Sequence, residues 1–200
     1  MRIISGLARG RKLYTPAGQS KQIRPTSDRA REALFSILGV KVVGSRVLDL
    51  FAGTGALGCE ALSRGASSVV FVDNSNHSLS LIKKNIPLIP GGAERSTIIK
   101  HDLRKSLPFS AFTARDLSPF DLIFADPPYQ KGFTEKTLRF LDKSIVLSKK
   151  VLIVAEENKD VELDMNFEEL FLDMRRRYGD TCFHFFIRKN KAKQKSRESS

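Results

Sequence analysis

The residues best suited to chemistry are Asp126, Pro127, Pro128 and Tyr129, which follow the apolar run 121–125. The two prolines have no N–H to donate, so this segment offers acceptors only: the Asp126 carboxylate and backbone carbonyls. Acceptors that hold the hydrogens of an exocyclic NH₂ direct its lone pair toward an electrophile, and a tyrosine ring can stack on an unpaired base. The pattern favours methylation of an amino group on a nucleic-acid base. A rigid turn without chemistry is the alternative, and Asp126 and water remain equally open as acceptors of the amine proton.

A glycine-rich segment forms the second candidate site. Residues 53–58 (GTGALG) follow the apolar run 47–51, and Asp73 comes 20 residues after Gly53. Glycines allow a tight turn and the close approach of a ligand to the backbone, and a carboxylate at the end of the next strand can accept hydrogen bonds from ribose hydroxyls. This spacing fits either a dinucleotide or S-adenosylmethionine.

Asp49 helps to choose between these cofactors. It lies four residues before Gly53, inside the expected strand. A carboxylate there opposes the binding of an anionic pyrophosphate but suits the sulfonium and ammonium groups of S-adenosylmethionine. The alternative is a buried acid that only accepts local backbone hydrogen bonds.

Asp102 could accept from the adenine amino group, or it could simply cap the next helix. The predicted cofactor-binding residues are Asp49, Phe51, Gly53, Thr54, Gly55, Asp73, Asn74 and Asp102.

Alternating strands and helices are expected to position these residues. Apolar runs predict strands at 47–51, 69–72, 97–100, 121–125, 151–155, 170–174 and 182–188, and helical spacing predicts helices at 30–38, 57–64, 75–85 and 134–141. Helix-capping chemistry is expected at 25–28, and a β-hairpin arm within 2–15. Such alternation is typical of an α/β fold with a mainly parallel sheet. We expect three parts: a basic arm and helix (1–46), the main domain (47–188) and a disordered basic tail (189–200).

The net charge of +12 is concentrated at the two ends of the chain. Residues 1–46 carry +8 and residues 171–200 carry +6, whereas the middle carries −2. Separated charge of this kind indicates a polyanion partner, and a solvated basic surface is the alternative. The predicted RNA-binding residues are Arg9, Arg11, Lys12, Arg24 and Arg29. Their segment is expected beside the carboxyl edge of the sheet, near Asp126.

Other features limit the possible settings for the protein. No apolar run is long enough to span a bilayer, and the first residues lack a signal-peptide core. Cys59 and Cys182 form no CxxC pair, and with the histidines they show no metal-ligand spacing. We therefore expect a cytoplasmic protein with reduced thiols, no metal and no membrane contact.

Several blocks together resemble a known family. VLDLFAGTGALG (47–58), VVFVD (69–73), the HDL containing Asp102, and LIFADPPY (122–129) look like the motifs of class I S-adenosylmethionine-dependent amino methyltransferases. MRIISGLARGRKL at the start, IRPTSDRAREALFSIL (23–38) and RRRYGDT (175–181) resemble the RsmD family, which methylates guanine N2 in 16S ribosomal RNA. The likeness covers about residues 1–188.

The resemblance implies a seven-stranded sheet with an antiparallel final hairpin. It implies that Asp49, Gly53 and Gly55 hold the methionine side of the cofactor, with Asp73 at the ribose, Asp102 at the adenine and 126–129 at the target base. Ribosomal RNA in a small-subunit particle is the expected partner, and the protein is expected to be a monomer. An adenine-N6 methyltransferase acting on RNA or DNA, a nicotinamide-dependent oxidoreductase and a non-catalytic RNA-binding protein are the rival interpretations.

Overall fold

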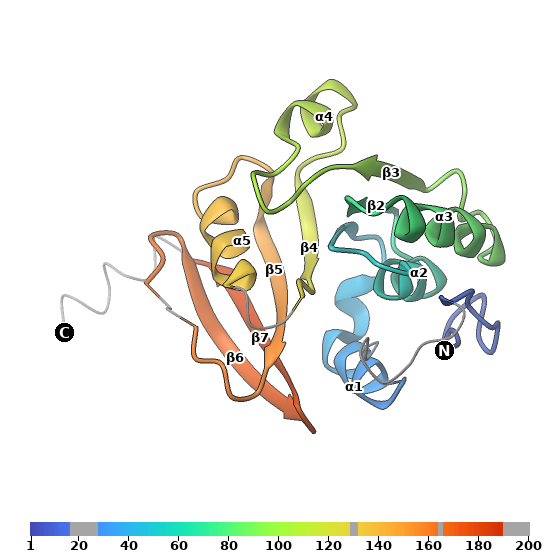
Figure 1. The fold of residues 1–200 in the computed structure, drawn as a ribbon, viewed down its shortest axis with the longest axis horizontal. Helices are drawn as coiled ribbons and strands as arrows, with labels where there is room; N and C mark the ends of the chain where they lie inside the picture. Colours follow the sequence, from blue (N-terminus) through green and yellow to red (C-terminus); the bar gives the residue numbers. More distant parts are fainter. Residues whose placement is uncertain (17–27, 129–131, 164–165, 190–200) are drawn as a thin grey trace.

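A seven-stranded sheet forms the centre of the molecule (Figure 1). The structure is a computed structural model, and it describes residues 1–16, 28–128, 132–163 and 166–189. The strand order is β3-β2-β1-β4-β5-β7-β6. Strands β1 to β5 are parallel, and β7 pairs antiparallel with β5 and β6. The bounds are β1 Arg46–Leu50, β2 Ser68–Asp73, β3 Ser96–Lys100, β4 Phe120–Ala125, β5 Leu147–Asn158, β6 Leu170–Tyr178 and β7 Thr181–Arg188. The predicted α/β fold and its antiparallel final hairpin are confirmed.

Helices cover both faces of this sheet, which is why its central strands are almost wholly apolar. On one face lie α1 (Asp28–Leu38), α2 (Ala56–Ser63) and α3 (Asn76–Asn85), with Phe35 of α1 packed on Phe124 of β4 at a ring-centroid distance of 5.7 Å. On the other face lie α4 (Phe109–Ala114) and α5 (Phe133–Leu141), through Phe112 and Leu138. Two 3₁₀ turns, Gly39–Val42 and Ile86–Leu88, follow α1 and α3. In the described ranges, no helix has both the length and the apolar character needed to cross a membrane.

Some element boundaries differ from the prediction. Helix α4 was missed because its six residues are too few to show a helical period. Strand β6 continues to Tyr178, whereas the prediction ended it at 174. The prediction stopped early because the last residues of the strand are exposed and show no apolar alternation. The backbone N–H of Lys189, the first residue of the predicted tail, donates to the Glu169 carbonyl at 2.6 Å. The remainder of that tail (190–200) and the predicted capping residues 25–27 lie outside the described residues.

The predicted N-terminal hairpin is reduced to a single antiparallel bridge between Arg2 and Lys12. The backbone turns sharply at Gly6 and Gly10, both with φ of +83°, so no regular ladder forms between them. A Cβ atom at Gly6 would lie 1.9 Å from the Ser63 carbonyl oxygen, so the segment runs directly against α2. The N–H groups of Ile4, Ser5, Leu7 and Ala8 bond to α2, whereas those of Ile3 and Gly10 bond within the segment.

Glu60 of α2 fastens this N-terminal segment to the domain. The Glu60 side chain is fully buried, and its two oxygens accept the backbone N–H groups of Ile4 at 2.7 Å and Ser5 at 3.0 Å. One of these oxygens also accepts from Arg64 Nε at 2.7 Å. One turn later, Ser63 Oγ accepts from the Ala8 N–H at 2.9 Å. These hydrogen bonds hold the N-terminal segment firmly against α2, because a hydrogen bond to a charged carboxylate is stronger than one to a neutral acceptor.

Glu60→Gln is accordingly expected to lower the free energy of unfolding by on the order of 3 kcal/mol, because the amide replaces an acceptor with a donor facing buried N–H groups. Chemical denaturation measures this, and limited proteolysis should show earlier cleavage within residues 1–14. Glu32→Gln, at an exposed position on α1, serves as the control. Equal stability of the two variants would show that Glu60 does not hold the segment.

Candidate active site

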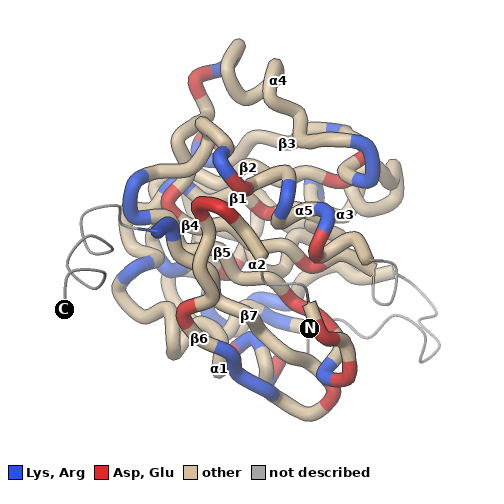
Figure 2. The backbone as a smooth tube through the Cα atoms, turned by 90° about the vertical axis from the view of Figure 1, so that its left-hand side faces the viewer, with Lys and Arg blue, Asp and Glu red and all other residues tan. Residues whose placement is uncertain are grey.

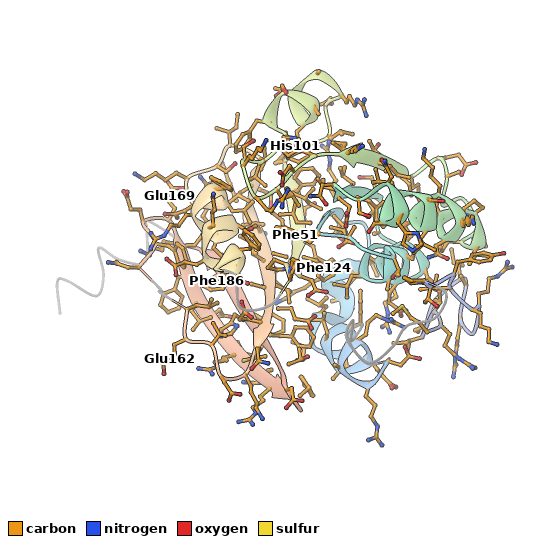
Figure 3. All side chains as sticks on the ribbon, in the orientation of Figure 1. Phe51, His101, Phe124, Glu162, Glu169 and Phe186 are labelled. Atoms are coloured by element: carbon orange, nitrogen blue, oxygen red, sulfur yellow. The ribbon has the colours of Figure 1, made fainter. Side chains whose placement is uncertain are left out.

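The glycine loop bends sharply where β1 ends. Phe51, Gly53 and Gly55 all adopt positive φ angles, of 59°, 55° and 75°. A positive φ is unfavourable for a bulky residue such as Phe51 and is found where the surrounding structure imposes it, often at functional sites. Figure 3 labels Phe51 near the middle of the molecule. Gly58 has another role, because a Cβ atom there would lie 2.2 Å from the Phe71 ring, and its absence lets α2 approach β2.

Asp73 organises this loop. At the end of β2, its Oδ2 accepts the Gly53 N–H at 2.9 Å and its Oδ1 accepts the Ser75 N–H at 2.8 Å. Each carboxylate oxygen has a second lone pair, so these bonds leave acceptor capacity for ribose hydroxyls. The neighbouring Asn74 is exposed at the same edge. Asp73 therefore holds the glycine loop in its shape, and it retains lone pairs at the position where the ribose is predicted to bind.

Asn85 is a site residue that the sequence did not reveal. It is fully buried at the end of α3, and its Nδ2 donates to the carbonyls of Thr54 at 2.9 Å and Tyr14 at 3.0 Å. Its Oδ1 accepts the Tyr14 N–H at 2.7 Å. This single amide ties the glycine loop to the N-terminal segment. No motif marks an asparagine at the end of a helix, so only the fold identifies it.

Asp49 is buried where β1 approaches the glycine loop. Its Oδ2 accepts the Gly58 N–H at 2.9 Å, so the local backbone bond that was considered as an alternative is present. Burial raises the pKa of Asp49 to about 8, the Gly58 N–H opposes this, and the charge of Asp73 adds to it. A positive group bound here would favour the ionised form. The residues therefore fit the positively charged methionine end of S-adenosylmethionine better than a pyrophosphate.

Asp102 lies after β3 and forms a two-bond ion pair with Arg104, at 2.7 Å to Nε and 2.9 Å to Nη2. The side-chain hydrogen bond from Arg104 is the main reason that the pKa of Asp102 falls to about 2. Both groups are exposed enough for water to weaken the pair. Contact between Asp102 and the adenine remains a prediction, and in this structure its oxygens are already engaged by Arg104.

Asp126 follows β4 at the same edge of the sheet. Its backbone N–H lies 3.4 Å from the Leu50 carbonyl oxygen, so it continues the pairing of β4 with β1. Burial raises the pKa of its carboxyl group well above the usual range, and the charges of Glu156, Asp49 and Glu157 add to the effect in that order. Pro127 is buried and Pro128 is exposed, whereas Tyr129 lies outside the described residues. The structure thus brings Asp49, Asp73 and Asp126 together at the carboxyl ends of β1, β2 and β4.

The predicted RNA-binding residues are spread more widely. Arg9, Arg11, Lys12 and Arg29 are exposed, and Arg24 lies outside the described residues. Ala8, the residue before Arg9, bonds to Ser63 at the C-terminal end of α2. The glycine loop is at the N-terminal end of this eight-residue helix, which is about 12 Å long. The structure therefore places only part of segment 1–46 beside the carboxyl edge of the sheet.

Arg31 is not a surface residue, although it belongs to the basic N-terminal segment. It is 1% exposed, it donates to the Arg2 carbonyl, and it pairs with Asp28 at 3.1 Å. Burial lowers its pKa. Figure 2 shows where Lys and Arg lie along the backbone. The consecutive arginines 175–177 of β6 are exposed. Cys59 and Cys182 are both free, buried thiols.

The fold and this site define a class I S-adenosylmethionine-dependent methyltransferase. The family model described as Conserved hypothetical protein 95 matches residues 1–187. The chain belongs to this family, the RsmD family, as its sequence motifs had indicated.

Individual relatives agree with this assignment. The chain is 36% identical over 156 residues to the ribosomal RNA small subunit methyltransferase D of Escherichia coli, covering 78% of this chain and 74% of that protein. It is 35% identical over 181 residues to YlbH of Bacillus subtilis, covering 90% of this chain and 95% of YlbH. The solved structure of yhhF from Escherichia coli has a TM-score of 0.77 and 31% identity, and the match covers 94% of this chain and 98% of that one. Because the chain belongs to a family of methyltransferases, the alternative of a nicotinamide-dependent oxidoreductase has no support.

Proposed function

We propose that this protein transfers a methyl group from S-adenosylmethionine to the exocyclic N2 amine of a guanine in bacterial small-subunit (16S) ribosomal RNA, in the cytoplasm. The observation that carries the proposal is the position of Asp126, at the carboxyl end of β4 beside Asp49 and the glycine loop, in a chain of the RsmD family. The relative from Escherichia coli carries the name of a small-subunit ribosomal RNA methyltransferase. The family-specific N-terminal blocks support the same substrate.

In this proposal the cofactor supplies a methyl group attached to a positively charged sulfur. The Asp126 carboxylate accepts one N–H of the target amine, and the Pro127 carbonyl is available for the other. Because the two prolines have no N–H groups, nothing in their backbone competes as a donor. The amine lone pair then points toward the methyl group, and placement rather than covalent help from the protein accounts for the rate. Tyr129 is proposed to stack on the extruded base.

RNA binding in this proposal depends on phosphate contacts from exposed Arg9, Arg11, Lys12 and Arg29, together with Arg24. Such contacts should make the affinity fall steeply with salt. Base identity would be read at the Asp126 pocket from an unstacked nucleotide. We propose that a monomer acts on RNA in a small-subunit particle.

The decisive test is transfer of label from radioactive S-adenosylmethionine into unmodified small-subunit RNA, offered free and as assembled particles, with identification of the modified nucleoside. N2-methylguanosine is the expected product. N6-methyladenosine would refute the guanine assignment while keeping the amine chemistry. Cofactor binding without transfer to either substrate would instead favour a non-catalytic RNA-binding protein.

A further inference from the structure

Two buried glutamates lie near the end of β5 beside Asp126, and the function proposed above assigns no role to them. Glu156 and Glu157 are each 2% exposed. Glu157 Oε2 accepts from Thr134 Oγ1 at 2.8 Å, so it points toward α5. Successive side chains of a strand point to opposite faces, and Glu156 therefore points to the face covered by α1 and α2.

Glu156 and Asp126 are neighbours across two parallel strands. Ala125 pairs with Ala155 in the last step of the β4–β5 register, and Asp126 and Glu156 are the next residues of each chain segment. Asp49 pairs with Phe124, two residues before Asp126, and so belongs to the same face. The fold thus places carboxyl groups from β1, β4 and β5 side by side on the face that carries the glycine loop.

The surroundings of this pair contain acids and a hydroxyl group. The charges acting on Asp126 are those of Glu156 and Glu157 from β5 and Asp49 from β1, while Asp73 of β2 acts on Asp49. From β7, Thr181 Oγ1 donates to Glu156 Oε1 at 3.4 Å. The buried cation of α1, Arg31, interacts with Asp28 and with Glu60 of α2. Within the described ranges, no cation is among the charges that act on Asp126.

We propose that Glu156 is a positioning residue for Asp126: the two carboxyl groups share one proton in the free protein, give it up when the positively charged cofactor binds, and thereby leave Asp126 as the acceptor of the proton from the methylated amine. The proposal rests on the methyl transfer described above. Two like charges on neighbouring residues of adjacent strands resist ionising together, and a nearby positive charge relieves that resistance.

The proton and charge balance follows from this arrangement. During transfer the bond between methyl carbon and sulfur breaks, its electron pair stays on sulfur, and a nitrogen–carbon bond forms. The nitrogen then gives one proton to an oxygen of Asp126. Positive charge disappears from the cofactor in the same step in which the carboxyl pair gains a proton, so the net charge of the buried site is unchanged.

Proton release on cofactor binding tests this inference without any RNA. Isothermal titration calorimetry at one pH in phosphate and in Tris, which differ in ionisation enthalpy, counts the protons released by S-adenosylmethionine and by S-adenosylhomocysteine, which lacks the sulfonium charge. The wild-type protein should release more protons with the first ligand than with the second. Glu156→Gln removes the largest of the like charges that raise the pKa of Asp126, so Asp126 is less protonated in the free protein and release with S-adenosylmethionine should fall about twofold, the remainder coming from Asp49 and the buried Asp126.

Glu157→Gln is the matched control, because it is equally buried but bonded to α5 on the opposite face, and its proton release should stay closer to the wild-type value. In single-turnover methyl transfer, the acid limb of the pH profile should move about one unit lower in Glu156→Gln. Unchanged proton release together with an unchanged acid limb would overturn the proposal.

Asp126→Asn keeps the test valid if Glu156→Gln does not fold. Its proton release should also fall. Where Glu156→Gln does fold, combining the two substitutions should cause no further loss if Glu156 acts through Asp126. Wild-type release in Asp126→Asn, or additive losses in the double variant, would refute the shared proton. A protein that shows the expected proton release but methylates no RNA would instead refute the proposed function alone.

Discussion

Replacing Asp126 with alanine is expected to slow methyl transfer by about 10²- to 10⁴-fold while cofactor binding persists. The carboxylate is the proposed acceptor for the target amine, and it follows β4 at the carboxyl edge, where open α/β sheets bind ligands. Because the residue acts on the amine rather than on the ribose or adenine, its loss should appear in the rate of the chemical step. Single-turnover transfer to RNA measures that rate, and calorimetry measures the cofactor affinity of the same preparation.

Asp121→Ala is the matched control for this experiment. Asp121 lies in the same strand at its opposite end, where Oδ2 accepts the Arg46 N–H at 3.0 Å. Its replacement should lower the melting temperature without a comparable loss in the rate of transfer. Near-normal turnover in Asp126→Ala would contradict the proposed role, and an equal loss in Asp121→Ala would mean that the defect comes from the fold of β4.

The core strands could be predicted from the sequence because they are buried on both faces. Residues 69–72 and 122–125 read as continuous apolar runs, a pattern that a two-sided parallel sheet requires. The same reasoning fails at the sheet edge. The arginines 175–177 extend β6 with exposed side chains, so backbone pairing with β7 decides the strand there and hydrophobicity does not.

The carboxylates of the site could be found because each one ends a strand or lies within it at a fixed spacing. Asp49, Asp73 and Asp126 are brought to one edge by the parallel order of β1, β2 and β4. Asn85, Glu60 and Glu156 could not be found in this way. Their partners are 31 to 71 residues away for Asn85 and 56 residues away for the Glu60–Ile4 bond, and such pairings depend on tertiary structure.

The basic N-terminal segment shows the limit of reading charge from sequence. Arg31 and Arg29 are two residues apart on α1, but the first is 1% exposed and the second is exposed. A helix places neighbouring residues on different faces, so composition cannot distinguish a guanidinium that clamps the core from one available to a phosphate. Burial in the folded structure assigns Arg31 to the core and leaves Arg29 accessible.

Asp73→Ala is expected to weaken S-adenosylmethionine binding by about 10- to 100-fold, which corresponds to the loss of one or two hydrogen bonds to a charged group. In the free protein the mutation also leaves the Gly53 and Ser75 N–H groups without their acceptor. Calorimetry with S-adenosylmethionine and S-adenosylhomocysteine should show similar losses, because both ligands carry the same ribose. Unchanged affinity would remove Asp73 from the ribose site.

Asn85→Ala separates the two contributions that Asp73 makes. It frees the glycine loop at Thr54 but removes no group proposed to contact the ribose. If loop order alone explained the effect of Asp73→Ala, both variants would lose affinity to a similar extent. A distinctly larger loss in Asp73→Ala is expected, because its carboxylate both shapes the loop and retains lone pairs for the ribose hydroxyls. The difference between the two variants therefore measures the ribose contact itself.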